Sequence, residues 1–284
     1  MKKIIMIFLL ASLLPAQQTS PITGQTFFDF TYNNEHYLSQ LKNRNSFDIK
    51  RILVFYDKQF EDNLNFRFGL EGNNADFAPS GTYNIFLKAL FIEKKICENN
   101  YSIQAGLFPT STNAFDEKIW GNRFLEKVIL DRTGLGSPTD IGVSIKGNLV
   151  SDLSFNLAIV NGTGIKPEND KNKKILSSFQ YKLLKDLTIE LYNDFENVAN
   201  GKNKMTNKVT AGFTNSNSNI GLTLFQKKYS KLATNMADSV SSGFSIFGSY
   251  NIFENVKAIG RYDSFDKNDL NTITRIPKIF CLLV

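Results

Sequence analysis

The sequence predicts an all-β protein, a transmembrane antiparallel β-barrel of about 14–16 strands. Three observations predict this fold: segments in which apolar and polar residues alternate, connections that are short and long in turn, and many strands of about ten residues, the length of a tilted bilayer crossing. Phe (25) and Tyr (10) are abundant, whereas Pro (7) is scarce. No segment is apolar over about 18 residues, so a transmembrane helix is not expected.

The alternation is clear in residues 64–71, 141–146, 187–192 and 220–225, where apolar and polar side chains take turns. A period of two residues gives a strand one apolar and one polar face. A soluble sandwich turns its apolar faces inward, whereas a membrane barrel turns them toward lipid. Alternation alone therefore leaves both architectures open.

The connections between the strands favour the barrel. Short connections at 60–63, 96–100 and 150–152 follow longer ones at 34–46, 74–82 and 111–138, and the pattern continues along the chain. Outer-membrane barrels have short turns on one rim and long loops on the other, and a Greek-key sandwich has no reason to sort its loops in this way. The expected strands are 26–33, 47–59, 64–73, 83–95, 101–110, 139–149, 153–161, 174–184, 187–197, 207–215, 219–229, 242–253 and 256–265.

The first sixteen residues predict a signal peptide. Met1-Lys2-Lys3 is a basic start, Ile4 to Leu14 is an apolar run, and Pro15-Ala16 ends it with a small residue. The apolar run is too short to span a membrane. The alternative is a hydrophobic first helix, but the polar residues 17–25 favour cleavage. Residues 17–284 are then expected to form one barrel domain in an exported protein.

The connection 111–138 breaks the strand pattern. It carries a helix-like stretch from Ala114 to Leu130 that mixes charged and large apolar residues. Its apolar side chains need a packing surface, so we expect this third outer loop to fold inward and narrow the lumen. A solvated external helix is the alternative. The residues expected in this constriction loop are Glu117, Trp120, Arg123, Glu126 and Arg132.

Several segments resemble one family in order and spacing. The stretches 106–112, 120–123, 139–147 and 158–164 resemble the central block of the phosphate-selective porins O and P, and 47–51 and 260–263 resemble an early and a late strand. The resemblance covers roughly residues 24–266. It implies an even-stranded barrel, usually assembled as a homotrimer, in which basic residues draw anions through a constriction.

The chain end departs from this family. Family barrels finish on an amphipathic strand with an aromatic last residue, whereas this chain ends in the apolar run Ile279 to Val284 after Pro277. Thirteen strands are also an odd number for a single-chain bacterial barrel. We therefore expect a truncated or aberrant end, or a poor fourteenth strand in the tail.

These observations predict an outer-membrane porin, a passive channel for small solutes with a weak preference for phosphate-like anions. The partners expected are outer-membrane lipid and small anionic solutes. On the predicted polar faces cations outnumber acids, and a positive wall attracts anions. Lys88 and Lys146 have few acids nearby in the sequence, whereas Arg123 either borders the pore or pins the loop to local acids. The predicted anion path contains Lys50, Arg67, Lys88, Lys146 and Arg261.

Catalytic and cofactor sites are not expected. The single histidine, His36, argues against a histidine-based triad and against a zinc site. Cys97 and Cys281 form no disulfide framework, and the sequence shows no metal site, cofactor motif or nucleic-acid patch. The alternatives to a porin are an outer-membrane barrel enzyme and a non-conducting structural or adhesive barrel. Conductance separates these classes.

Overall fold

The computed structural model describes residues 5–6, 21–32, 42–60, 63–73, 83–98, 100–198, 202–230, 238–254, 256–267 and 278–283. The chain divides into two compact units, residues 1–90 and 91–284. Most of the predicted signal peptide lies outside the described residues, as do His36 and most of the predicted long connections 34–46, 74–82 and 230–241. Among the described residues no helix is long and apolar enough to cross a membrane.

The first unit is built from antiparallel strands in chain order. They are β1 (Ile5–Met6), β2 (Ile22–Tyr32), β3 (Asn45–Gln59), β4 (Leu64–Asn73) and the start of β5 (Asn84–Ile96). β2 pairs with β1 and β3, and β3 pairs with β4. A register shift between Phe27 and Phe28 marks a bulge in the β2–β3 pair, which alters the alternation of faces at that point.

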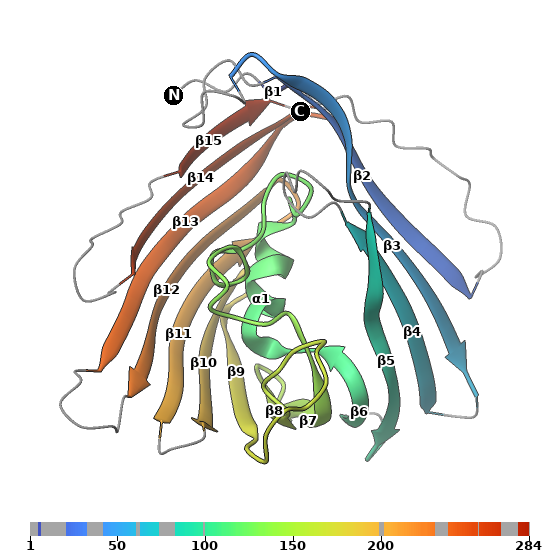
Figure 1. The fold of residues 1–284 in the computed structure, drawn as a ribbon. Helices are drawn as coiled ribbons and strands as arrows, with labels where there is room; N and C mark the ends of the chain where they lie inside the picture. The colour runs from blue at the N-terminus through green and yellow to red at the C-terminus, as the bar shows by residue number, and fades with distance from the viewer. Residues whose placement is uncertain are drawn as a thin grey trace. The chain divides into compact units, whose positions relative to one another are not determined.

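The second unit contains the end of β5, the antiparallel strands that follow it, and two helices. The strands are β6 (Tyr101–Pro109), β7 (Thr139–Val150), β8 (Leu153–Val160), β9 (Lys174–Leu184), β10 (Leu187–Val198), β11 (Lys202–Thr214), β12 (Ser218–Ser230), β13 (Ser239–Phe253), β14 (Val256–Lys267) and β15 (Lys278–Leu283). From β6 to β15 each strand pairs with the next one along the chain. The helices are α1 (Ser111–Trp120) and α2 (Ile129–Arg132), both between β6 and β7 (Figure 1).

The all-β antiparallel fold is confirmed, and all thirteen predicted strands are present as β2–β14. One predicted long connection, 198–206, is wrong, because β10 extends to Val198 and β11 begins at Lys202. Lys204 pairs in register with Glu196, and their side chains form a 2.9 Å ion pair that extends the hairpin. Of the two alternatives for the chain end, the structure has the short strand in the tail: β15, of six residues, pairs with β14.

The two faces of the second unit differ as predicted. On β12 Gly221, Thr223 and Phe225 are buried, whereas Ile220, Leu222 and Leu224 are 40–51% exposed. β7 and β10 follow the same rule, with Ile141, Val143 and Leu191 exposed on one face and polar residues covered on the other. We call the covered side the inner face and the apolar exposed side the outward face.

Candidate functional site on the inner face

The long loop 110–138 lies on the inner face of the second unit. Its helix α1 contacts β9, β10, β11, β12 and β13 (Figure 1). The helix ends at Trp120 and is capped by Gly121, whose φ of 62° is left-handed and whose N–H donates to the Glu117 carbonyl. After this turn the Trp120 indole donates to the Glu126 carbonyl at 2.9 Å, which folds the loop back on the helix. The predicted inward loop is therefore what the structure shows within this unit.

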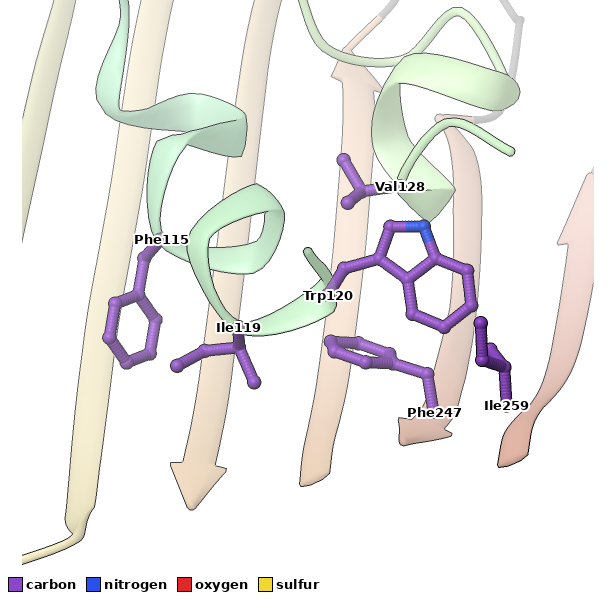
Figure 2. Close-up of a cluster of buried hydrophobic side chains, with 6 residues drawn as sticks. All are labelled: Phe115, Ile119, Trp120, Val128, Phe247 and Ile259. Carbon is purple, nitrogen blue, oxygen red and sulfur yellow. The ribbon is translucent and has the colours of Figure 1, made fainter. Parts of the chain in front are cut away.

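Apolar packing holds the loop against the sheet. Phe115, Ile119 and Trp120 of α1 pack with Phe247 of β13 and Ile259 of β14, and Val128 joins them from the loop (Figure 2). A second cluster joins Ile129, Leu130 and Leu135 to Phe225 and Phe265. Trp120 and Phe247 meet edge to face, with ring centroids 5.6 Å apart. These clusters provide the packing surface that the apolar residues of the loop require.

A glycine makes room for the helix. A Cβ added to Gly212 of β11 would lie 2.6 Å from two side-chain carbons of Ile119. Gly212 shares the inner face with the buried residues Thr210 and Lys208. The absence of a side chain at this position allows α1 to approach the strand closely.

A buried ionic network fastens the middle of α1. The Lys208 ammonium is fully buried and lies 2.9 Å from both the Asp116 and the Glu190 carboxylates. It also donates to the Thr112 carbonyl at 2.8 Å. The other Asp116 oxygen accepts a 2.6 Å hydrogen bond from the Thr210 hydroxyl. One lysine thus serves two acids, one on the helix and one on the sheet.

A second network fastens the end of the loop. Arg261 of β14 is only 4% exposed, forms two hydrogen bonds to Asp263 and donates to the Lys127 carbonyl at 2.6 Å. Its guanidinium lies over the Trp120 ring, 5.2 Å from the ring centroid. Arg132 approaches the same Asp263 carboxylate at 3.2 Å. Arg261 therefore anchors the loop, and its role in the anion path remains a prediction.

Within the loop, Arg123 is surrounded by acids. Its guanidinium lies 3.2 Å from Asp131 and 3.7 Å from Glu117. This geometry favours the loop-pinning alternative over an arginine offered to a solute. The Glu126 side chain accepts from the backbone N–H of Lys127, while its own carbonyl accepts from the Trp120 indole.

Four predicted anion-path residues lie in ion pairs. Lys88 is 3.0 Å from Glu71, and Lys146 is 3.1 Å from Glu93, so each lysine has an acidic partner although its local sequence holds few acids; their place in the anion path stays a prediction. Arg67 forms a two-bond pair with Asp57, and Lys50 lies 3.3 Å from Asp48. Glu71 and Glu93 lie on strands other than those of their lysines, which is why the local sequence around Lys88 and Lys146 did not reveal them.

Sequence reasoning did not identify the role of the triad Lys208, Asp116 and Glu190. Lys208 and Glu190 lie on the inner face of neighbouring strands, but nothing in the local sequence indicated that Asp116 would meet them. Only one sequence feature hints at this network, and it is weak. Lys208 stands in the middle of an otherwise uncharged strand segment, and such a lysine needs an acid from elsewhere in the chain if it becomes buried.

In the connection 161–173 the acid Glu168 is bonded within the connection itself. Glu168 accepts from the Lys173 ammonium at 2.7 Å and from the N–H groups of Asn169 and Asp170. The hydrogen bond from Lys173, helped by those of the backbone, lowers the pKa of Glu168. Across the part of the chain that the structure describes, no cluster of His, Cys, Asp and Glu could hold a metal ion.

Comparison with solved structures defines the class of fold. The chain resembles an anion-selective porin from Comamonas acidovorans, with a TM-score of 0.62 and 13% identity over 91% of this chain and 82% of that one. It also resembles OmpT, an outer membrane protein of Vibrio cholerae, with a TM-score of 0.56 and 12% identity over 96% and 83% of the two chains. The fold is that of a porin-like β-barrel.

No family model matches the chain, and no curated protein matches its sequence. The resemblance to the phosphate-selective porins O and P therefore remains a prediction, while the general porin fold is established by structure.

Proposed function

We propose that this protein is an outer-membrane diffusion channel for small solutes, with a weak preference for small anions. One observation carries the proposal: the long loop is fixed on the polar inner face, while the opposite face of the same strands is apolar and exposed. An apolar outward face suits lipid, and a polar face narrowed by a loop suits a solute path. The fold shared with the solved anion-selective porin and with the outer membrane protein OmpT supports this assignment and a place in the bacterial outer membrane.

The preference for anions rests on this chain's own charges. The similar protein from Comamonas acidovorans is described as anion-selective, but at 13% identity that likeness carries the fold alone. Most inner-face cations described above are neutralised by acids. Such paired groups contribute little net field, so the preference should be weak.

Three inner-face lysines provide the positive excess. Among the described residues, Lys182, Lys227 and Lys257 have no acid within ion-pairing distance. Lys227 is buried and donates to the Leu135 carbonyl at 2.6 Å, so it faces the loop. Lys182 and Lys257 lie near the short connections 185–186 and 254–255, where their charge remains available to solutes.

Reversal potentials in planar bilayers across a potassium chloride gradient test the proposal. We expect a modest chloride preference that weakens as salt rises, because the Debye length is about 8 Å at physiological ionic strength and shorter above it. The double variant Lys182→Ala, Lys257→Ala should lose most of the preference. The control Lys173→Ala removes a lysine already paired with Glu168 in an outer connection and should change little. Cation preference or no conductance would contradict the proposal and favour the structural or enzymatic alternatives.

The predicted anion-path residues enter the same experiment. Removing Lys146 leaves the Glu93 carboxylate uncompensated, so Lys146→Ala should shift selectivity toward cations, and Lys88→Ala should do the same through Glu71. Arg123→Ala should leave selectivity intact and make the current noisier, because Arg123 pins the loop to Asp131. The homotrimer implied by the family resemblance is tested by the mass of the protein in detergent.

A further inference from the structure

A small hollow lies in the inner face of the second unit, on strands β6 to β9. Its volume is about 340 Å³, at the lower end of the range of about 300–1,000 Å³ that small-molecule sites have. It lies beside the short connections 96–100 and 150–152, because Asn100 and Asn148 form part of its wall. We call it the polar hollow.

Strand register brings uncharged side chains together in the polar hollow. Asn148, Ser154 and Gln180 are register partners across β7, β8 and β9. Asn156 lies two positions after Ser154 on β8 and therefore shares its face. Three amides and one hydroxyl thus line one side of a space that holds a single small molecule.

These groups have unused hydrogen-bonding capacity. Within the described residues, the Ser154 hydroxyl and the side-chain amides of Asn148 and Asn156 make no hydrogen bond. Gln180 donates from its amide nitrogen to Glu190 at 3.3 Å, which leaves its side-chain oxygen as an acceptor. Amides and hydroxyls offer donors as well as acceptors, and so do the hydroxyl groups of a sugar. The wall therefore suits a solute that carries several hydroxyl groups.

The charges beside the polar hollow favour a solute with one negative charge. The nearby acids are engaged by cations, since Glu93 lies 3.1 Å from Lys146 and Glu190 lies 2.9 Å from Lys208. Lys95 also lines the hollow and is exposed, and within the described residues no acid lies at ion-pairing distance from it. A free ammonium beside uncharged donors and acceptors offers a carboxylate a charge-assisted hydrogen bond.

We propose that the polar hollow is a binding subsite for a small hydroxylated carboxylate, a sugar acid with one carboxylate group. The carboxylate lies toward Lys95, and the hydroxyl groups exchange hydrogen bonds with Asn148, Ser154 and Asn156. The inference rests on the proposed function, since the solute has to reach the inner face, and it deepens that function by naming the class of solute. A hollow that holds only water is the competing outcome of the test.

The first test compares three probes by saturation-transfer NMR on the full chain in detergent. The probes are gluconate, glucose and butyrate, which carry both features, hydroxyl groups alone and a carboxylate alone. We expect gluconate to bind about fivefold more tightly than either of the others, because only gluconate uses the amides and Lys95 together. Equal binding of glucose or butyrate, or no binding of gluconate, would overturn the proposal.

The second test places the subsite with variants of its wall. The double variant Ser154→Ala, Asn156→Ala should weaken gluconate binding roughly tenfold, because two neutral hydrogen bonds are lost. The control Ser249→Ala removes a hydroxyl from the inner face of β13, outside the polar hollow, and should leave gluconate binding unchanged. Unchanged binding in the double variant, or an equal loss in the control, would show that gluconate does not bind here.

Charge variants test the position of the carboxylate. Asn156→Asp keeps the shape of the side chain and adds a negative charge, so it should abolish gluconate binding and leave the weaker binding of glucose within about twofold. Lys95→Met should weaken gluconate binding about threefold to tenfold and bring it close to that of glucose. Gluconate binding that neither variant changes would contradict the assignment of a carboxylate to this hollow.

Current block in planar bilayers separates this inference from the proposed function. Gluconate should reduce the single-channel potassium chloride current of the unmodified protein, and about tenfold more gluconate should be needed for the same block in the double variant Ser154→Ala, Asn156→Ala. Equal block of the two proteins would overturn the subsite while leaving the channel intact. A protein without conductance would contradict the proposed function, and the NMR comparison would still decide whether the subsite exists.

Discussion

Two regions of the molecule contain ion pairs between the same types of side chain, but the pairs differ in how exposed they are to solvent. In the first unit the Arg67–Asp57 pair is 40–41% exposed, and Lys50 beside Asp48 is 36% exposed. In the second unit Lys208, Asp116 and Glu190 are almost fully buried under α1. In this comparison the residue types are similar, and the cover that α1 provides is what makes the second set a buried anchor of the loop.

Breaking the buried network of Lys208, Asp116 and Glu190 should produce the largest change in unfolding free energy. Lys208→Met removes one cation from two buried acids and should cost about 3–5 kcal/mol of unfolding free energy. Urea unfolding in lipid vesicles measures it, and single-channel noise should rise as α1 loosens. Lys50→Met, the exposed counterpart, should cost less than about 1 kcal/mol. Similar losses in the two variants would show that the loop does not distinguish the two regions.

The next largest change in unfolding free energy is expected when an arginine is placed on the outward face rather than on the inner face. Leu222→Arg places a charge on the exposed apolar face and should cost about 2–4 kcal/mol if that face meets lipid. Ser154→Arg, on the polar inner face of β8, should cost much less. The measurement is again unfolding in vesicles, and equal costs for the two arginines would contradict the assignment of faces.

A smaller effect tests the close approach of α1. Gly212→Val would place side-chain atoms on Ile119 and should cost about 1–3 kcal/mol by overpacking. Combining it with Ile119→Ala should recover part of the loss, as a double-mutant cycle would show. Additive losses would mean that α1 does not rest on β11 at this point.

The smallest change in unfolding free energy is expected for the exposed ion pairs of the first unit. Arg67→Met should change the unfolding free energy by less than about 1 kcal/mol, because both partners are well exposed. Its effect should appear instead in selectivity, since Asp57 loses its counter-charge. A loss as large as that of Lys208→Met would mean that this pair is covered as well.

The strands were predictable because each one is a local pattern. Residues 220–225 alternate in a way that fits a two-faced strand, and the assignment of its faces followed from which positions are apolar. The inward loop was predictable for a related reason, since Trp120 and Ile119 had no other surface to cover. The 198–206 connection failed because Asn203 to Thr206 has no apolar alternation strong enough to indicate a strand.

The partners within the site were not predictable from local patterns. Lys88 meets Glu71 and Lys146 meets Glu93 only through strand register, and Glu93 lies on β5 while Lys146 lies on β7. Asp116 meets Lys208 across 92 positions of sequence. Such pairs depend on where the loop comes to rest, and no short window of sequence contains that information.

The anchors of the loop also fix an order of events during folding. Residues 110–138 are made early, but they are held by Lys208, Phe247 and Arg261, which follow much later, and the Arg261–Lys127 bond joins positions 134 apart. Contacts so distant in sequence form late, because the conformational entropy of the long intervening chain is lost before the contact stabilises the fold. The loop is therefore expected to take its final place on the inner face only when the last strands are present, so that in an assembly intermediate the loop would leave this face less covered than in the finished protein.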